Sequence, residues 1–174
     1  MKSIPFYLLF IFSIAFALIT FLTNNDDEEI ARNNNANQNQ PNLSIELSDN
    51  EKEIFTEIVR NVQLSSQIMK ELDLLLEEQQ KYDELEGAIE AMSIAHEETL
   101  IVVSKILNDP TTENKELNDL QNYITKLLTD YTTGLILQLE GIEKEDSKKV
   151  QKGYSLSTSA KEKLFKLKKE VEQI

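Results

Sequence analysis

Residues 150–174 read VQKGYSLSTSAKEKLFKLKKEVEQI, and this stretch decides the fold class. Its apolar and small residues recur with alternating spacings of three and four, which keeps them on one stripe of an α-helix. The first half of the stripe offers only small residues, so we expect a neighbouring helix to approach closely there. The stripe comprises Val150, Gly153, Ser157, Ala160, Leu164, Leu167, Val171 and Ile174.

The same spacing recurs three times between residues 55 and 142. Ser48 followed by Glu51 is the pattern of a capping box, so the first helix is expected to begin there. Pro110 ends the second segment, because proline disfavours helical geometry at the preceding residue. Thr111 or Thr112 is the predicted cap of the third helix. The three stripes are Phe55, Ile58, Val62, Ser65, Met69, Leu72 and Leu76; Tyr82, Leu85, Ile89, Met92, His96, Thr99, Val103 and Ile106; and Leu117, Leu120, Ile124, Leu127, Tyr131, Leu135, Leu139 and Ile142.

The chain is therefore predicted to be all-α, and two architectures fit. One is an antiparallel four-helix bundle with turns near residues 79–83, 109–111 and 143–147. The other is a long two-helix hairpin bent at Pro110. We favour the bundle because additional apolar residues widen each face beyond a two-stranded contact, although no glycine or proline marks residues 79–83. These additional residues are Ile54, Val59, Ile68, Leu75, Ile101, Val102, Leu107 and Leu128.

The N-terminus predicts a membrane address. Residues 4–22 carry no charge and would span about 28 Å as a helix, close to the hydrocarbon thickness of about 30 Å. Lys2 precedes this run and acidic residues follow it, which favours an inside N-terminus and an outside C-terminal domain. The alternative is a cleaved secretory signal, because Ala15-Phe16-Ala17 has a small-x-small form. A secreted helical effector would result.

The domain organisation follows from these segments. Residues 1–23 are the expected signal-anchor helix. Residues 24–47 are rich in Asn and Gln with little to bury, so we expect a disordered linker. Residues 48–174 are the expected extracytoplasmic helical bundle.

Composition and charge exclude several function classes. The 174 residues include no cysteine, which rules out disulfides and thiolate chemistry. The formal net charge of −13 argues against nucleic-acid binding and against nonspecific attachment to anionic lipid. Charge is also uneven: residues 48–109 carry fifteen acidic and five basic residues, whereas residues 144–174 carry nine lysines and five acidic residues. We interpret the basic last helix as a complement to acidic neighbours; the alternative is contact with an anionic partner.

No motif carries catalytic or metal chemistry. His96 is the only histidine, and residue 93 is Ser where a di-iron Glu-x-x-His pair needs Glu. Nucleophile-elbow and phosphate-loop patterns are absent from the sequence. Adjacent carboxylates such as Glu77-Glu78 and Glu97-Glu98 point about 100° apart on a helix, so they do not converge on a substrate. We predict no catalytic, cofactor-binding or metal residues, and assign the tyrosines Tyr82, Tyr123, Tyr131 and Tyr154 to packing.

These expectations combine into one functional hypothesis. The chain is predicted to be a noncatalytic, membrane-tethered helical module that mediates protein–protein interaction at the cell envelope, with the membrane contacted through residues 4–22. An alternative is an extracytoplasmic small-ligand sensor that acts through a separate membrane partner.

Overall fold

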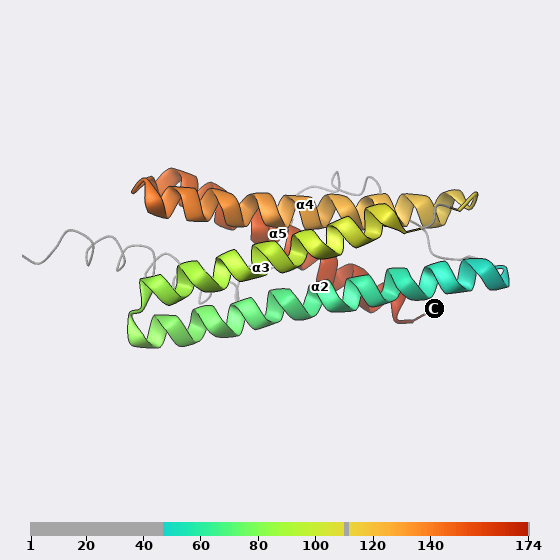
Figure 1. Ribbon diagram of the computed structural model, residues 1–174, viewed down its shortest axis with the longest axis horizontal. Coiled ribbons are helices and arrows are strands. Elements are labelled where there is room, and N and C mark those ends of the chain that lie inside the picture. Colours follow the sequence, from blue (N-terminus) through green and yellow to red (C-terminus); the bar gives the residue numbers. More distant parts are fainter. Residues whose placement is uncertain (1–46, 110–111, 174) are drawn as a thin grey trace, which may run out of the picture. The chain divides into compact units, whose positions relative to one another are not determined.

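The computed structural model describes residues 47–109 and 112–173, all of which belong to one compact unit, Pro41–Ile174. The described residues form four helices and no strands (Figure 1). The predicted anchor and linker lie outside the described residues. The all-α prediction is confirmed for the part that the structure describes. The helices are α2 (Asp49–Tyr82), α3 (Leu85–Asn108), α4 (Lys115–Glu143) and α5 (Ser147–Val171).

The helices pack as a bundle in which each contacts its neighbour along the chain, and α2 also contacts α5. Consecutive helices fold back on one another rather than continuing into long arms. Contacts between α2 and α3 show the antiparallel order, because Glu57 pairs with Lys105 while Gln79 lies beside Gly87. The structure therefore differs from the two-helix hairpin, which would have needed an unbroken helix through residues 79–83.

Two tight turns use residues other than glycine in the left-handed backbone region. Asp83 has a φ of 57° at the end of α2, and Glu145 has a φ of 54° between α4 and α5. In the second turn the Asp146 N–H donates to the Gly141 carbonyl at 2.8 Å, which closes the end of α4. The turns lie where the sequence predicted them. The first carried no sequence signal because Asp83 takes the position that glycine would usually hold.

The N-termini of α2 and α4 are closed by side-chain hydrogen bonds. Glu51 accepts hydrogen bonds from the Ser48 backbone N–H at 2.8 Å and from the Ser48 hydroxyl at 2.6 Å, which confirms the predicted start of α2. The cap of α4 differs from the prediction. Asn114, rather than Thr112, accepts the backbone N–H groups of Glu116 and Leu117, and Thr111 lies outside the described residues. Thr112 instead holds the Asn114 N–H at 3.1 Å and so supports the cap.

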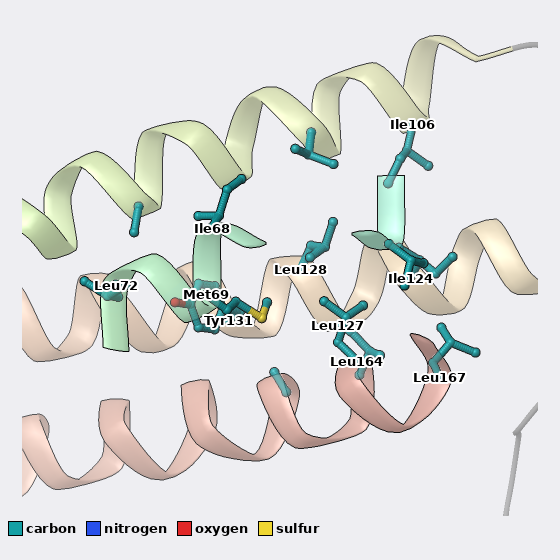
Figure 2. Close-up of a cluster of buried hydrophobic side chains, with 14 of the residues drawn as sticks. Ile68, Met69, Leu72, Ile106, Ile124, Leu127, Leu128, Tyr131, Leu164 and Leu167 are labelled. Carbon is teal, nitrogen blue, oxygen red and sulfur yellow. The ribbon is translucent and has the colours of Figure 1, made fainter. Parts of the chain in front are cut away.

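All four helices contribute to one apolar core, part of which is drawn in Figure 2. Its largest fully buried side chains come from the predicted stripes. Because each buried leucine or isoleucine contributes about 1.5–3 kcal/mol, these stripes dominate the stability of the bundle. They include Met69, Leu117, Leu120, Ile124, Leu164 and Leu167. Leu128, one of the additional apolar residues beside the stripes, is also fully buried.

The closest helix–helix approach joins α4 and α5 through small residues, as the first half of the last stripe predicted. A Cβ placed on Gly153 would lie 2.5 Å from the Gly134 carbonyl oxygen, and one on Gly134 would lie 2.6 Å from the Ser157 backbone nitrogen. Gln138 donates a hydrogen bond to the Ser157 hydroxyl at 3.2 Å across the same contact. Glycine at these positions therefore allows the two backbones to touch.

Several apolar residues that we expected to widen the buried faces lie elsewhere. Ile68, Val102 and Leu128 are buried as predicted, and Ile54 and Val59 pack at the edge of the core. The expectation was wrong for the remaining residues, because the helices next to α2 and α3 cover only part of each widened face. The exposed exceptions are Leu75, Ile101 and Leu107. Tyr82, which was predicted to begin the stripe of the second helix and to pack, is instead the last residue of α2 and is exposed.

Candidate interaction surface

The described residues contain no cluster of metal-ligating side chains. No group of three or more His, Asp or Glu residues among them lies close enough to hold a metal ion. His96 is half-buried in α3. The neighbouring glutamates Glu97 and Glu98 are exposed on the surface of that helix.

Large apolar side chains are exposed on one half of the bundle. Within residues 47–109 and 112–173, every large hydrophobic side chain that is exposed belongs to α2 or α3. Single exposed apolar residues are ordinary, but a group confined to two neighbouring helices is typical of a contact surface. The group comprises Leu64, Leu74, Leu75, Tyr82, Ile94, Leu100, Ile101 and Leu107.

Three of these side chains share one flank of α2. Leu75 is eleven positions after Leu64, and Tyr82 is seven positions further, so all three point within about 20° of one another. Asp73 lies nine positions before Tyr82, which places it on the opposite side of the helix. Because Asp73 binds Lys161 of α5 at 2.7 Å, the flank with the exposed side chains faces away from α5.

The same flank of α2 adjoins α3, as one ion pair shows. Glu57 is seven positions before Leu64 on that flank, and its carboxylate lies 2.8 Å from the Lys105 ammonium. Lys105 follows Ile101 by one helical turn, and Ile94 is seven positions before Ile101. The exposed side chains of Leu64, Leu75 and Tyr82 on α2 and of Ile94 and Ile101 on α3 therefore lie along the outer side of the contact between the two helices. We call these five residues the α2–α3 row.

Polar contacts join α2 to the C-terminal end of α3 beside the row. The hydrogen bond and charge of Lys105 hold the pKa of the Glu57 carboxyl below its usual value. Asn61 is buried nearby and donates from its side-chain amide to Asp109 at 3.3 Å. Ser65 and Thr99, also buried, each return a hydrogen bond to a carbonyl of their own helix. The Glu57–Lys105 and Asn61–Asp109 contacts therefore join α2 to the end of α3, and the exposed side chains of the row lie outside them.

Carboxylates alternate with the apolar members of the α2–α3 row. Glu71 and Glu78 lie on the exposed side of α2 between Leu64 and Tyr82, and Glu90 and Glu97 lie one turn before and after Ile94. Among the described residues, these four glutamates form no ion pair; Glu71 accepts only a hydrogen bond from Gln67. The row is therefore apolar with an acidic border.

The lysines of α5 behave differently. Lys161 binds Asp73 of α2, and Lys149 forms a short ion pair with Glu140 of α4. These two contacts agree with our interpretation that the basic last helix complements acidic neighbours. Lys70 of α2 lies 5.8 Å from the centre of the Phe165 ring and adds a cation–π contact between α2 and α5. The face of α2 toward α5 is thus already occupied, in contrast to the α2–α3 row.

Comparison with family models, curated proteins and solved structures found no match to this chain. None of the helices in the described ranges is both long and apolar enough to cross a membrane. The predicted spanning segment, residues 4–22, is outside these ranges. The sequence analysis missed the α2–α3 row because it assigned Leu75, Tyr82 and Ile101 to packing. The signal that could have revealed the row is that these helices contain more apolar residues than one buried stripe requires.

Proposed function

We propose that this protein is a noncatalytic interaction module, tethered to the cell membrane through residues 4–22 and presenting its helical bundle outside. The uncharged run behind Lys2 supports the address, and the acidic residues after it support the orientation. In this proposal the protein acts by placing a binding surface at the cell envelope. The anchor holds the module at the membrane, the linker lets the bundle extend away from it, and one helix surface of the bundle binds another protein.

One observation carries the interaction part of this proposal. The α2–α3 row exposes five large apolar side chains, and Ile101 and Tyr82 are each 69% exposed. Leaving such side chains in water forgoes about 25 cal/mol for each Å² that could be buried. A partner that covers the row would recover this free energy, which is the usual basis of association through a helix surface.

The test uses the full-length protein in its native cells. Fractionation and protease digestion from outside should show that the chain pellets with membranes and that the bundle is cleaved. A photoreactive residue introduced as Ile101→p-benzoylphenylalanine should then form a covalent adduct with another protein, whereas Ser155→p-benzoylphenylalanine on the exposed side of α5 should not.

Other outcomes would contradict separate parts of the proposal. Recovery of the bundle from the medium with Leu18 as its first residue would mean that the leader is a cleaved signal, and the membrane address would be wrong. A membrane-bound chain that forms no adduct from position 101, or equal adducts from both positions, would refute the assignment of the α2–α3 row as the contact surface.

A further inference from the structure

We infer that the α2–α3 row binds a basic amphipathic helix of a partner protein. This inference rests on the proposed function, because it names the partner chemistry of the same surface. It is drawn from three features of the row: its length, the spacing of its side chains and the charge of its border.

The dimensions fit a helix. Leu64 and Tyr82 mark the ends of the row and are eighteen positions apart on α2, which is about 27 Å. The apolar side chains of the row recur at helical spacings on both α2 and α3, seven or eleven residues apart. A third helix that lies along both of them can therefore bring its own side chains into register with the row. A partner helix of about 18 residues would cover the whole row.

The charge of the border selects the partner's polar residues. Glu71, Glu78, Glu90 and Glu97 surround the apolar side chains and, within the described part of the chain, none of the four is neutralised by an ion pair. A partner helix with lysine or arginine beside its apolar residues would complement this border on both sides. An acidic helix would place like charges together when water is excluded, which opposes binding.

The same charge argues against a second copy of this chain. In a two-fold dimer through the row, the four glutamates of one copy would face those of the other, which is repulsive. Docking of α5 from another copy would supply lysines, but α5 exposes no large apolar side chain among its described residues. An anionic lipid surface is disfavoured for the same electrostatic reason.

The experiment uses the full-length chain in nanodiscs of neutral phosphatidylcholine, with the photoreactive residue at position 101 or, as the control, at position 155. The probe is a helical peptide of about 18 residues with leucines at spacings of three and four and lysines beside them. A matched probe carries glutamate in place of each lysine. We expect the lysine probe to label position 101 about ten-fold more than the glutamate probe does, and neither probe to label position 155 strongly.

Charge reversal provides the decisive control. In a chain that carries Glu71→Lys, Glu78→Lys, Glu90→Lys and Glu97→Lys, the preference should invert, so that the glutamate probe labels position 101 more. All four residues are exposed, so circular dichroism should confirm that the fold is unchanged. Raising the salt concentration to about 1 M, where the Debye length is about 3 Å, should reduce the preference in both chains.

The inference fails if both probes label position 101 equally or if charge reversal leaves the preference unaltered. It also fails if the adduct from position 101 joins a second copy, the chain's own residues 1–46, or phosphatidylglycerol when that lipid is added to the nanodisc. The native-cell adduct in the preceding test does not depend on the probes. If position 101 forms that adduct but shows no preference between the two probes, this inference is refuted and the proposed function stands. Loss of the native-cell adduct would instead remove the proposed function.

Discussion

The side-chain amide of Asn114 donates a hydrogen bond of 2.9 Å to Glu51 Oε1, and so joins the N-terminus of α4 to that of α2. Each residue also closes its own helix, Asn114 by accepting two backbone N–H groups and Glu51 by accepting from Ser48. The two helices are not neighbours along the chain. This contact therefore fixes the level at which two separated helices begin, at one end of the bundle.

Substitution of Asn114 should cost more than the loss of an isolated cap. Asn114→Ala removes the acceptor for two N–H groups, which by itself lowers the free energy of unfolding by about 0.5–2 kcal/mol. It also removes the donor to Glu51. We expect chemical denaturation to show that the loss of unfolding free energy in the double variant differs from the sum of the losses in Asn114→Ala and Glu51→Ala, because the two residues share one hydrogen bond. Strictly additive losses would show that the caps act independently. Thr111→Ala should have a much smaller effect than Asn114→Ala, since the residue that caps α4 is Asn114.

Acid should weaken the fold through Glu51. Hydrogen bonds from the Ser48 hydroxyl, the Ser48 N–H and the Asn114 amide hold the pKa of the Glu51 carboxyl below its ordinary value of 4.5. A carboxyl whose pKa is lowered on folding contributes stability that is present above its unfolded pKa and lost as the pH falls through the folded pKa. Melting temperatures measured downward from pH 6 should therefore decline more steeply for the wild-type chain than for Glu51→Gln. Parallel declines would refute this contribution.

Alkali should weaken the fold through Tyr131. Burial, and then the charge of Asp73, raise the pKa of the Tyr131 hydroxyl well above its ordinary value of 10.0. The stability linked to this group is complete below the unfolded pKa and is lost as the pH rises through it toward the folded pKa. Tyr131→Phe should keep the core filled while making stability between about pH 9 and pH 11 less dependent on pH. Titration followed by tyrosine absorbance would detect the retarded ionisation directly, and a tyrosine signal that titrates entirely near 10 would exclude it.

The close contact of α4 and α5 makes an unusual prediction for Gly153. Replacing a helical glycine by alanine ordinarily stabilises a helix by about 1 kcal/mol. In Gly153→Ala, however, the new Cβ would lie 2.5 Å from the Gly134 carbonyl oxygen and 2.7 Å from the Gln138 backbone nitrogen. Forcing the two backbones apart costs about 1–3 kcal/mol, so we expect a net loss of stability in urea denaturation.

Gly87 supplies the matched control for that experiment. It is also a helical glycine, but a Cβ there would meet only the flexible side chain of Gln79. Gly87→Ala should therefore be neutral or stabilising. If Gly153→Ala were as stable as Gly87→Ala, the α4–α5 backbones would not be in contact in the folded protein.

The helices were predictable because spacing of three and four is a local property of the chain. The small residues Gly153 and Ser157 also indicated that a neighbouring helix approaches closely. The sequence could not identify Asn114 as the cap, since Thr111 and Thr112 also follow Pro110 and have side chains that can cap a helix.

The α2–α3 row was beyond prediction for a different reason. Periodicity shows that Leu75 and Ile101 flank the buried stripes, but it does not show which flank a neighbouring helix covers. That depends on where α4 and α5 lie around α2 and α3, which is a property of the whole bundle. The additional apolar residues indicated that these faces are buried against another surface. Among the described residues, however, no helix covers the side chains of the α2–α3 row.

Leu164 provides the direct test of the bundle. Its side chain is fully buried in the core, as is that of Leu167 one turn later. Leu164→Ala should lower the free energy of unfolding by about 2–5 kcal/mol through the lost contacts and the cavity. Leu164→Asp adds the cost of burying a carboxylate to the cost of the lost contacts. The total loss should exceed about 5 kcal/mol, which is the lower end of the stability range of ordinary domains. Circular dichroism should show an unfolded or strongly destabilised domain.

Gln151→Asp introduces the same charge at an exposed position of α5 and should leave the melting temperature nearly unchanged. A Leu164→Asp chain that melted like Gln151→Asp would mean that α5 does not pack on this stripe.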